Sequence, residues 1–136
     1  MRARRILLID DDEAFVESNR DLLEAYDYEV MSASNGVAGL EKAKKLKPDL
    51  MILDVMMEYP TEGFDVARQV RQTPGLQDTP ILLVTGVMNA MGIRESLFSD
   101  KKWLPVDRIL EKPIDPSVLI KEVERILGKK GEGEGK

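Results

Sequence analysis

The chain has 136 residues, which is the length of one ordinary domain. It contains neither cysteine nor histidine, which excludes disulfides, thiolate metal sites, Ser-His-Asp triads and any histidine general base. Its 20 basic and 25 acidic residues give a formal net charge of −5, which argues against binding to nucleic-acid phosphates. The apolar runs are too short for a membrane span or a signal peptide. We therefore expect a soluble cytoplasmic protein.

The first part of the chain alternates short apolar runs with segments of helical periodicity. Runs of four apolar residues without alternation are typical of strands that are buried on both faces. The apolar spacing and the turn residues predict a strand at 6–9, a helix at 13–26, a strand at 28–33, a helix at 37–46 and a strand at 50–53. Asp12 is placed to cap the first of these helices, because a carboxylate is favoured at the positive end.

The second part of the chain continues the same alternation. It predicts a helix at 64–72, a strand at 81–84, a helix around 90–98, a strand at 106–111 and a last helix that begins at 115–117 and ends at 127. A strand–helix unit repeated five times predicts an open parallel α/β sheet with helices on both faces. The low-complexity segment 128–136 is expected to be a disordered tail, so the predicted domain is 1–127.

Four of the apolar runs end in polar residues. Asp10 and Asp11 follow the first run, Asp54 follows the third, Thr85 the fourth and Lys112 the fifth. In a parallel sheet these ends share one edge, and ligands bind beyond that edge where the strand order reverses. We therefore expect residues that are about 100 positions apart in the sequence to converge in one crevice.

The charges of this group indicate its chemistry. Three carboxylates and one ammonium leave about two negative charges, and crowded carboxylates raise one another's pKa unless a cation compensates them. Because the chain offers only oxygen ligands, Mg²⁺ (or Mn²⁺) is the natural cation. A carboxylate nucleophile beside a cation, the Lys112 ammonium and the Thr85 hydroxyl suits phosphoryl transfer to an aspartate.

Taken together in this order, the motifs at the strand ends resemble the receiver domain of two-component response regulators, the CheY-like family, over roughly residues 4–127. The matching motifs are Ile6-Leu-Leu-Ile-Asp-Asp-Asp12, Pro48-Asp-Leu-Met-Ile-Leu-Asp54, Ile81-Leu-Leu-Val-Thr-Gly86 and Leu110-Glu-Lys-Pro113. The resemblance implies a flavodoxin-like fold: a doubly wound, five-stranded parallel sheet of strand order 2-1-3-4-5. It also implies a cis peptide bond between Lys112 and Pro113.

The resemblance assigns a role to each residue of the group. Asp54 would be the phosphoacceptor, Thr85 the switch hydroxyl and Lys112 the ammonium that pairs with the phosphoryl group. The metal ligands would be Asp10, Asp11, Asp54 and the backbone carbonyl of Met56. These roles are what membership of the family would imply.

The implied reaction needs a second protein. The chain has no histidine, so the phosphoryl donor would be a sensor histidine kinase or a phosphotransfer protein, and the signal would pass to an unknown output protein. We expect a regulatory domain rather than an enzyme, with only self-directed phosphotransfer and autodephosphorylation. No direct contact with nucleic acid or membrane is expected. The domain would act alone or as a fragment of a longer regulator.

The loop after Asp54 departs from the family pattern. Glu58 replaces the usual proline, and Gly63 comes one residue late, so the loop is remodelled beside the expected metal. Glu58 would either reach the metal's water shell or be a solvated loop charge, and we favour the second interpretation. Ile109 stands where the family usually has an aromatic switch residue; Phe98 and Trp103 are candidates to replace that ring.

The segment 87–105 is longer than the family pattern, which indicates either an altered partner surface or a tolerated loop insertion. Two other functions remain alternatives. One is an adaptor with a receiver fold that works without phosphorylation. The changed loop at Glu58 and the missing aromatic ring at Ile109 support this alternative. The other is a hydrolase with an aspartate nucleophile, although the sequence shows no cap domain and no further general base.

Overall fold

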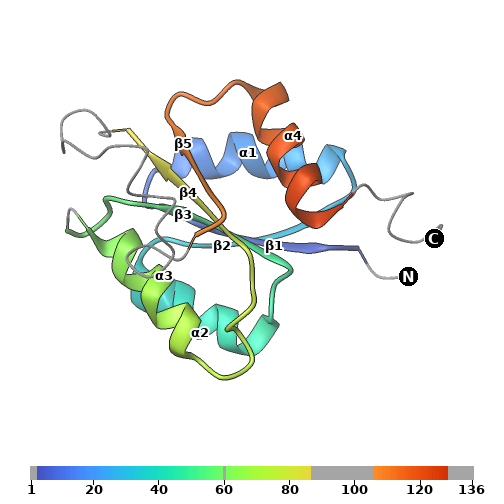
Figure 1. Cartoon of the computed structure of the whole chain (residues 1–136). Coiled ribbons are helices and arrows are strands. Elements are labelled where there is room, and N and C mark those ends of the chain that lie inside the picture. The colour runs from blue at the N-terminus through green and yellow to red at the C-terminus, as the bar shows by residue number, and fades with distance from the viewer. Residues whose placement is uncertain (1–2, 60, 87–105, 129–136) are drawn as a thin grey trace.

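Strands and helices alternate along residues 3–59, 61–86 and 106–128, the part of the chain that the computed structural model describes (Figure 1). The elements are β1 (Arg5–Ile9), α1 (Glu13–Ala25), β2 (Glu29–Ala33), α2 (Gly36–Leu46), β3 (Leu50–Asp54), α3 (Glu62–Gln72), β4 (Ile81–Thr85), β5 (Arg108–Glu111) and α4 (Pro116–Leu127). The predicted order of strands and helices is confirmed for these residues.

The five strands form one parallel sheet in the order β2-β1-β3-β4-β5, which confirms the expected strand order. All residues of β3 and β4 are buried, as their uninterrupted apolar sequences predict for central strands of a parallel sheet. From β1 the chain first goes outward to β2 and then returns to pair β3 on the other side of β1. The strand order therefore reverses between β1 and β3, and ligands of such folds bind at the carboxyl ends of these strands.

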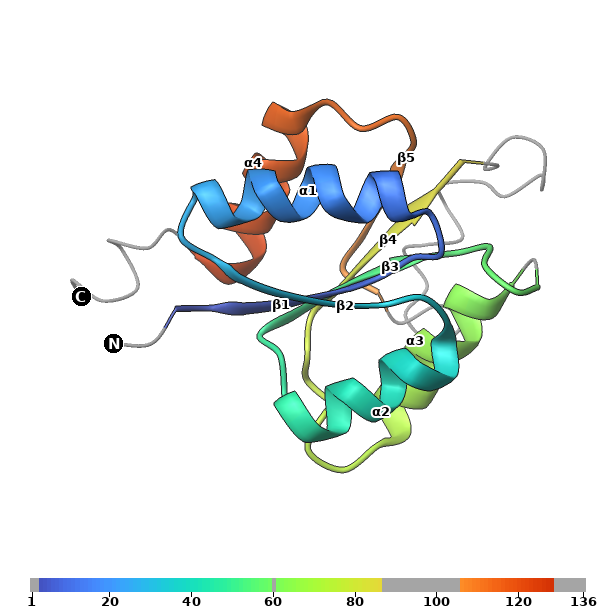
Figure 2. The ribbon, with the colours of Figure 1, turned by 180° about the vertical axis from the view of Figure 1, so that it is seen from behind.

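Helices cover both faces of the sheet (Figures 1 and 2). Helices α1 and α4 lie on one face, and α2 and α3 lie on the other. Alternate residues of β1 enter the two cores: Leu7 and Ile9 pack with the α2 and α3 side chains, and Ile6 and Leu8 pack with those of α1 and α4. The sheet is therefore packed between two apolar layers, and the loops that follow the strands lie at its carboxyl edge.

Three described helices begin at capping side chains. Asp12 caps α1 by accepting a hydrogen bond from the backbone N–H of Phe15, as the sequence predicts. Asn35 accepts from Ala38 at the start of α2, and Asp115 accepts from Ser117 at the start of α4. Local sequence therefore sets where these helices start, and the starts of α1 and α2 lie next to the carboxyl edge of the sheet.

Two boundaries differ from the sequence-based expectation. Helix α3 begins at Glu62, two residues before the expected start, because its first turn includes a buried glutamate that the apolar pattern did not reveal. Strand β5 begins at Arg108 and not at 106. Before it, the backbone N–H of Asp107 donates to the Ile81 carbonyl, and the Asp107 carboxylate accepts from the Ile81 N–H, so a side chain takes the place of one rung of the strand ladder.

Several predicted features lie outside the described residues. They are the helix around 90–98, the long segment 87–105 with Phe98 and Trp103, and the tail from residue 129 onward. The proposed boundary between a domain at 1–127 and a tail at 128–136 stays a prediction. No helix in the described ranges has both the length and the apolar composition needed to cross a bilayer.

Candidate functional site

The carboxyl edge of the sheet brings the predicted residues to one end of the molecule. Asp54 is the last residue of β3 and Thr85 the last of β4, while Asp10 and Lys112 directly follow β1 and β5. Asp54 is paired with Val84, so Thr85 lies one position beyond Asp54 on the neighbouring strand. The parallel topology therefore produces the convergence that the sequence analysis expected.

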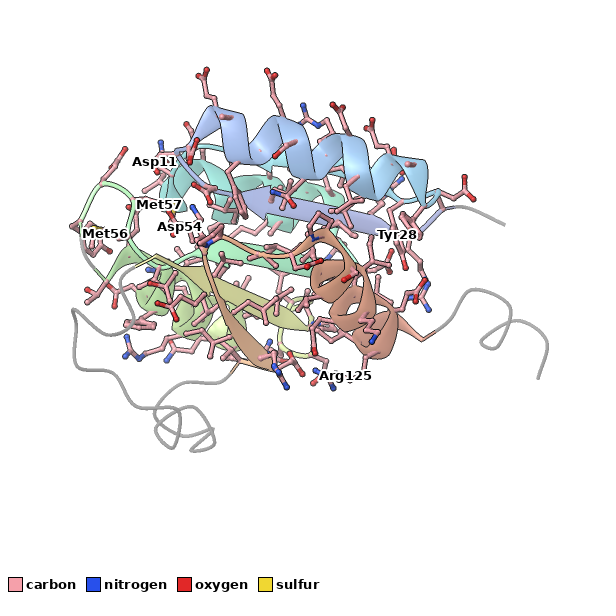
Figure 3. All side chains as sticks on the ribbon, turned by 90° about the horizontal axis from the view of Figure 1, so that it is seen from above. Asp11, Tyr28, Asp54, Met56, Met57 and Arg125 are labelled. Atoms are coloured by element: carbon pink, nitrogen blue, oxygen red, sulfur yellow. The ribbon has the colours of Figure 1, made fainter. Side chains whose placement is uncertain are left out.

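Three carboxylates lie close together at this edge. Asp10, Asp11 and Asp54 each offer an oxygen, and these oxygens all lie within 4.8 Å of one another. Asp10 and Asp54 are only 3% and 6% exposed, whereas Asp11 is exposed. The backbone N–H of Asp12 donates to Asp10 Oδ1 over 2.9 Å, which orients the Asp10 carboxylate. Figure 3 shows Asp11 and Asp54 at the same end of the sheet as Met56.

Lys112 supplies a positive charge beside two of these acids. Its Nζ lies 2.9 Å from Asp10 Oδ2 and 3.9 Å from Asp54 Oδ2. The backbone N–H of Lys112 donates to the Thr85 carbonyl over 2.8 Å, which continues the pairing of β4 and β5 into the site. The peptide bond between Lys112 and Pro113 is cis, as expected. Among the described residues, the Lys112 ammonium therefore pairs with two of the three clustered carboxylates.

The excess of negative charge changes the acidity of Asp54. The pKa of Asp54 is raised from 3.8 to about 7: burial raises it most, the nearby Asp10 carboxylate also raises it, and the Lys112 ammonium partly opposes both effects. The site therefore holds more negative charge than its own ammonium compensates. A bound cation would lower the pKa of Asp54 and keep its carboxylate ionised.

The residues fit a hard divalent cation. Among the described residues, no group donates a hydrogen bond to the buried Asp10 Oδ2, whose ion pair with Lys112 Nζ spans 2.9 Å. A buried carboxylate oxygen without a hydrogen bond calls for another partner. The donors are all oxygens, which Mg²⁺ prefers. Asp10, Asp11 and Asp54 are the residues that would hold such an ion together.

Two expected participants have less direct support. Met56 lies in the loop after β3, beside Asp54 in Figure 3, and the role of its backbone carbonyl as a metal ligand stays a prediction. Thr85 is fully buried, and its role as the switch hydroxyl also stays a prediction. Ile109 is buried in the core between the sheet and α2 and α3, so it serves packing at the position where an aromatic ring was expected.

The residue that the sequence analysis missed is Glu62. It is 3% exposed, and its carboxylate accepts hydrogen bonds from the backbone N–H of Glu58 over 2.7 Å and of Gly36 over 2.5 Å. It therefore ties the loop after Asp54 to the start of α2. The Glu58 side chain is exposed and lies outside the aspartate cluster, which supports the interpretation as a solvated loop charge.

Two glycines are the sequence features that could have pointed to the contact between Glu62 and the start of α2. A Cβ on Gly36 would lie 2.7 Å from Glu62 Oε2, and a Cβ on Gly63 would lie 2.3 Å from the Asp54 carbonyl oxygen. Both positions therefore need glycine because another chain segment approaches closely. In the sequence, a glycine at a helix start and a Glu-Gly pair after the acceptor are signs that another segment comes close. The sequence does not show which segment this is, because Gly36 and Glu62 are 26 positions apart.

The comparison with known sequences supports the same family. Residues 6–124 match the model of the response regulator receiver domain. The chain is 33% identical to the alkaline phosphatase synthesis transcriptional regulatory protein PhoP of Bacillus subtilis, over 91% of this chain and 48% of that protein. It is 28% identical to the protein PilH of Pseudomonas aeruginosa, over 90% of this chain and 97% of that protein. The chain thus spans about half the length of the first curated relatives that it matches.

Solved structures agree with this result. The chemotaxis response regulator CheY4 of Vibrio cholerae superimposes with a TM-score of 0.79 at 30% identity, covering 92% of this chain and 99% of that one. A CheY-like receiver domain protein of Methanospirillum hungatei superimposes with a TM-score of 0.79 at 25% identity, covering 96% and 98%. The sheet order, the aspartate cluster and these matches lead to one conclusion: the chain belongs to the response regulator receiver domains of two-component systems.

Proposed function

We propose that the chain is a phosphorylation-dependent signalling switch in which Asp54 accepts a phosphoryl group. One observation carries the proposal: a buried Asp54 carboxylate lies within 4.8 Å of two other aspartates, and the Lys112 ammonium lies 3.9 Å from it. The donor is the phosphohistidine of a sensor histidine kinase or of a phosphotransfer protein. The reaction is a single turnover on the domain's own side chain, followed by autodephosphorylation, which distinguishes it from a conventional enzyme.

The proposed reaction gives each side chain a task. An Asp54 oxygen supplies an electron pair to phosphorus, and the bond between phosphorus and the donor's histidine nitrogen breaks. Lys112 is close enough to pair with a phosphoryl oxygen, and the Thr85 hydroxyl donates a hydrogen bond to another. A Mg²⁺ or Mn²⁺ ion, held by Asp10, Asp11, Asp54 and the Met56 carbonyl, supplies further neutralisation of the transferred charge.

The signal is a local change of charge with a wider effect. The phosphoryl group adds negative charge next to the end of β4, where Thr85 stands. Movement of Thr85 toward that charge would displace the chain that follows β4 and change the surface near β5. The output partner is a further protein domain, in the same chain or in another molecule. We place the reaction in the cytoplasm, with proteins as its direct partners.

The test is phosphorylation by a small-molecule phosphodonor. The protein is incubated with acetyl phosphate and Mg²⁺, and the intact mass is measured. We expect a gain of one phosphoryl group in the wild type, none in Asp54→Asn and none when EDTA is present. Asp78→Asn is a matched control, because Asp78 is exposed in the loop before β4, at the opposite edge of the sheet. Absence of the gain in the wild type, or its persistence in Asp54→Asn, contradicts the proposal.

The adaptor function that needs no phosphorylation has weaker support. It does not explain why a buried acid, a neighbouring aspartate pair and an ammonium are assembled at one strand edge. Pull-downs with and without phosphodonor distinguish the two. Phosphorylation that changes the set of bound proteins supports the switch, and an identical set in both conditions supports the adaptor.

A further inference from the structure

The Lys112 ammonium has a third neighbour besides its two acids. Its Nζ lies 4.2 Å from the centroid of the Phe15 ring. The negative face of an aromatic ring attracts a cation within about 6 Å of its centroid. Phe15 is in the first turn of α1, and its place in the apolar spacing of that helix gave no sign of a role in the site. The site therefore includes an aromatic face that no expected role explains.

The first turn of α1 fixes the backbone of Phe15, and core packing holds its ring. Its backbone N–H donates to the capping carboxylate of Asp12 over 3.2 Å, and its carbonyl accepts from the side-chain amide of Asn19 over 2.8 Å. The ring also packs against the core that α1 and α4 share with the sheet. The ring that contacts the Lys112 ammonium is therefore carried by the first turn of helix α1, which is a regular element and not a loop.

Lys112 has two carboxylate partners at different distances. Its Nζ is 2.9 Å from Asp10 Oδ2 and 3.9 Å from Asp54 Oδ2, and one oxygen of each aspartate lies within 4.8 Å of the other. An ammonium on a flexible four-carbon stem can exchange one of these partners for the other by a small movement. Such a movement stays within about 6 Å of the ring centroid, the reach of the cation–π attraction.

Asp10 has two competing partners. It forms the closer ion pair with Lys112, and it is also one of the three carboxylates proposed to hold a cation. When Asp10 binds the cation, its ion pair with Lys112 is weakened. Without another fixed contact, the long Lys112 side chain would then adopt other conformations and leave the site. The contact between Lys112 and the Phe15 ring does not depend on which partner either carboxylate binds.

We propose that Phe15 is a positioning residue: its ring keeps the Lys112 ammonium beside Asp54 while the closer carboxylate partner, Asp10, is given up. The proposal rests on the proposed function, since Lys112 matters there only if Asp54 receives a phosphoryl group. It assigns no contact between Phe15 and the phosphoryl group. An aliphatic side chain of similar size fills the same space but has no negative face, so it cannot replace the ring.

The test compares Phe15→Leu with Phe15→Tyr, which keeps the aromatic face. The initial rate of phosphorylation by acetyl phosphate at saturating Mg²⁺ is measured, and thermal unfolding checks that both variants fold. We expect Phe15→Leu to be about three- to tenfold slower, and Phe15→Tyr to remain within about twofold of the wild type. In a Lys112→Ala background, Phe15→Leu should cause no further loss, because the ring acts through Lys112.

A second measurement does not depend on phosphorylation. In NMR spectra of the protein without phosphodonor or Mg²⁺, the ε-methylene protons of Lys112 should be shifted upfield by the ring current of Phe15. The shift should persist in Phe15→Tyr and disappear in Phe15→Leu. Absence of this upfield shift in the wild type overturns the proposal, whatever the kinetics are.

The outcomes also separate this proposal from the proposed function. A wild type that accepts no phosphoryl group refutes the function itself. A wild type that does so, with Phe15→Leu equally fast, overturns only the role of Phe15. Equal slowing by Phe15→Leu with and without the Lys112 side chain also overturns it, because the effect would then come from packing alone.

Discussion

The two edges of the sheet use aspartates in opposite ways. At the amino edge, Asp49 precedes β3, and its carboxylate accepts the Arg5 backbone N–H over 2.7 Å, while its own N–H donates to the Arg5 carbonyl. Asp107 precedes β5 and makes the same reciprocal pair with Ile81. Each of these acids therefore completes a strand ladder.

The described acids at the carboxyl edge do not make such reciprocal pairs across strands: the Asp10 carboxylate accepts the backbone N–H of Asp12, two residues further along the same loop. Asp10 and Asp54 are buried beside each other, burial together with the Asp10 carboxylate raises the pKa of Asp54 to about 7, and one Asp10 oxygen accepts no hydrogen bond from the described residues. Buried carboxylates in this state weaken the fold unless a ligand compensates them. The aspartates at the amino edge therefore hold neighbouring strands together. Those at the carboxyl edge form a site that can bind a positively charged group. Four variants test this contrast.

Lys112→Ala should have the largest effect, at the carboxyl edge. Removing a positive group from beside the transferred phosphoryl group should slow phosphorylation by about 100-fold. Mass spectrometry over time with acetyl phosphate and Mg²⁺ measures the rate. The matched change at the amino edge is Arg71→Ala, which removes a cation 3.7 Å from Asp107 and should leave the phosphorylation rate unchanged. Equal slowing by both variants would contradict the contrast.

Glu62→Gln should weaken the connection between the acceptor loop and α2. A carboxylate accepts hydrogen bonds from two backbone N–H groups here, and an amide has one acceptor oxygen, so one buried N–H loses its partner. We expect the free energy of unfolding to fall by about 2 kcal/mol. Chemical denaturation measures it. Glu58→Gln, in the same loop but exposed, is the control and should change stability little.

Asp54→Asn should stabilise the protein without Mg²⁺. The pKa of Asp54 is about 7 in the folded state against 3.8 ordinarily, so between these values the folded state binds more protons than the unfolded state. Wild-type stability should therefore fall as pH rises through this window. At pH 8 with EDTA, we expect Asp54→Asn to be more stable by about 1–2 kcal/mol.

Thermal or urea unfolding at several pH values measures this difference. It should vanish near pH 4, where the wild-type carboxyl group is neutral in the folded protein, and it should shrink when Mg²⁺ is added at pH 8. If the stability difference between Asp54→Asn and the wild type does not grow from pH 4 to pH 8 in EDTA, Asp54 is not destabilised by its surroundings.

Asp107→Asn should have the smallest effect. The amide oxygen can still accept the Ile81 N–H, so the variant loses only the charge opposite Arg71. A partly exposed ion pair of this kind contributes about 0.5 kcal/mol. Denaturation measures the loss, and the phosphorylation rate should equal that of the wild type. A rate that falls along with stability would mean that the two edges are not independent.

Much of the fold could be predicted because its signals are local. Four apolar residues in a row mark a strand that is buried on both faces, as in β1, and Asp12 marks the start of α1. The start of α3 was misplaced because its first turn holds Glu62, a charged residue whose burial depends on Gly36 and on the loop after Asp54. A charged residue gives no apolar signal, so its burial could not be inferred from its own segment.

The amino-acid sequence alone was enough to predict which residues meet at the site. Asp10, Asp54, Thr85 and Lys112 stand at the ends of apolar runs, and parallel strands joined by crossovers bring all such ends to one edge. The excess of acid over base among these residues is likewise a property of the sequence, and it is what points to a cation. Topology alone sufficed for these conclusions because it does not depend on side-chain detail.

The contacts between these side chains could not be predicted and appear only in the folded structure. It shows that Lys112 is closer to Asp10 than to Asp54, that the Phe15 ring lies at its ammonium, and that Glu62 is buried between two backbone N–H groups. Each of these contacts joins side chains or loops from different elements. Differences of about one ångström between alternative partners depend on how helices pack on the sheet, and packing is a property of the whole fold.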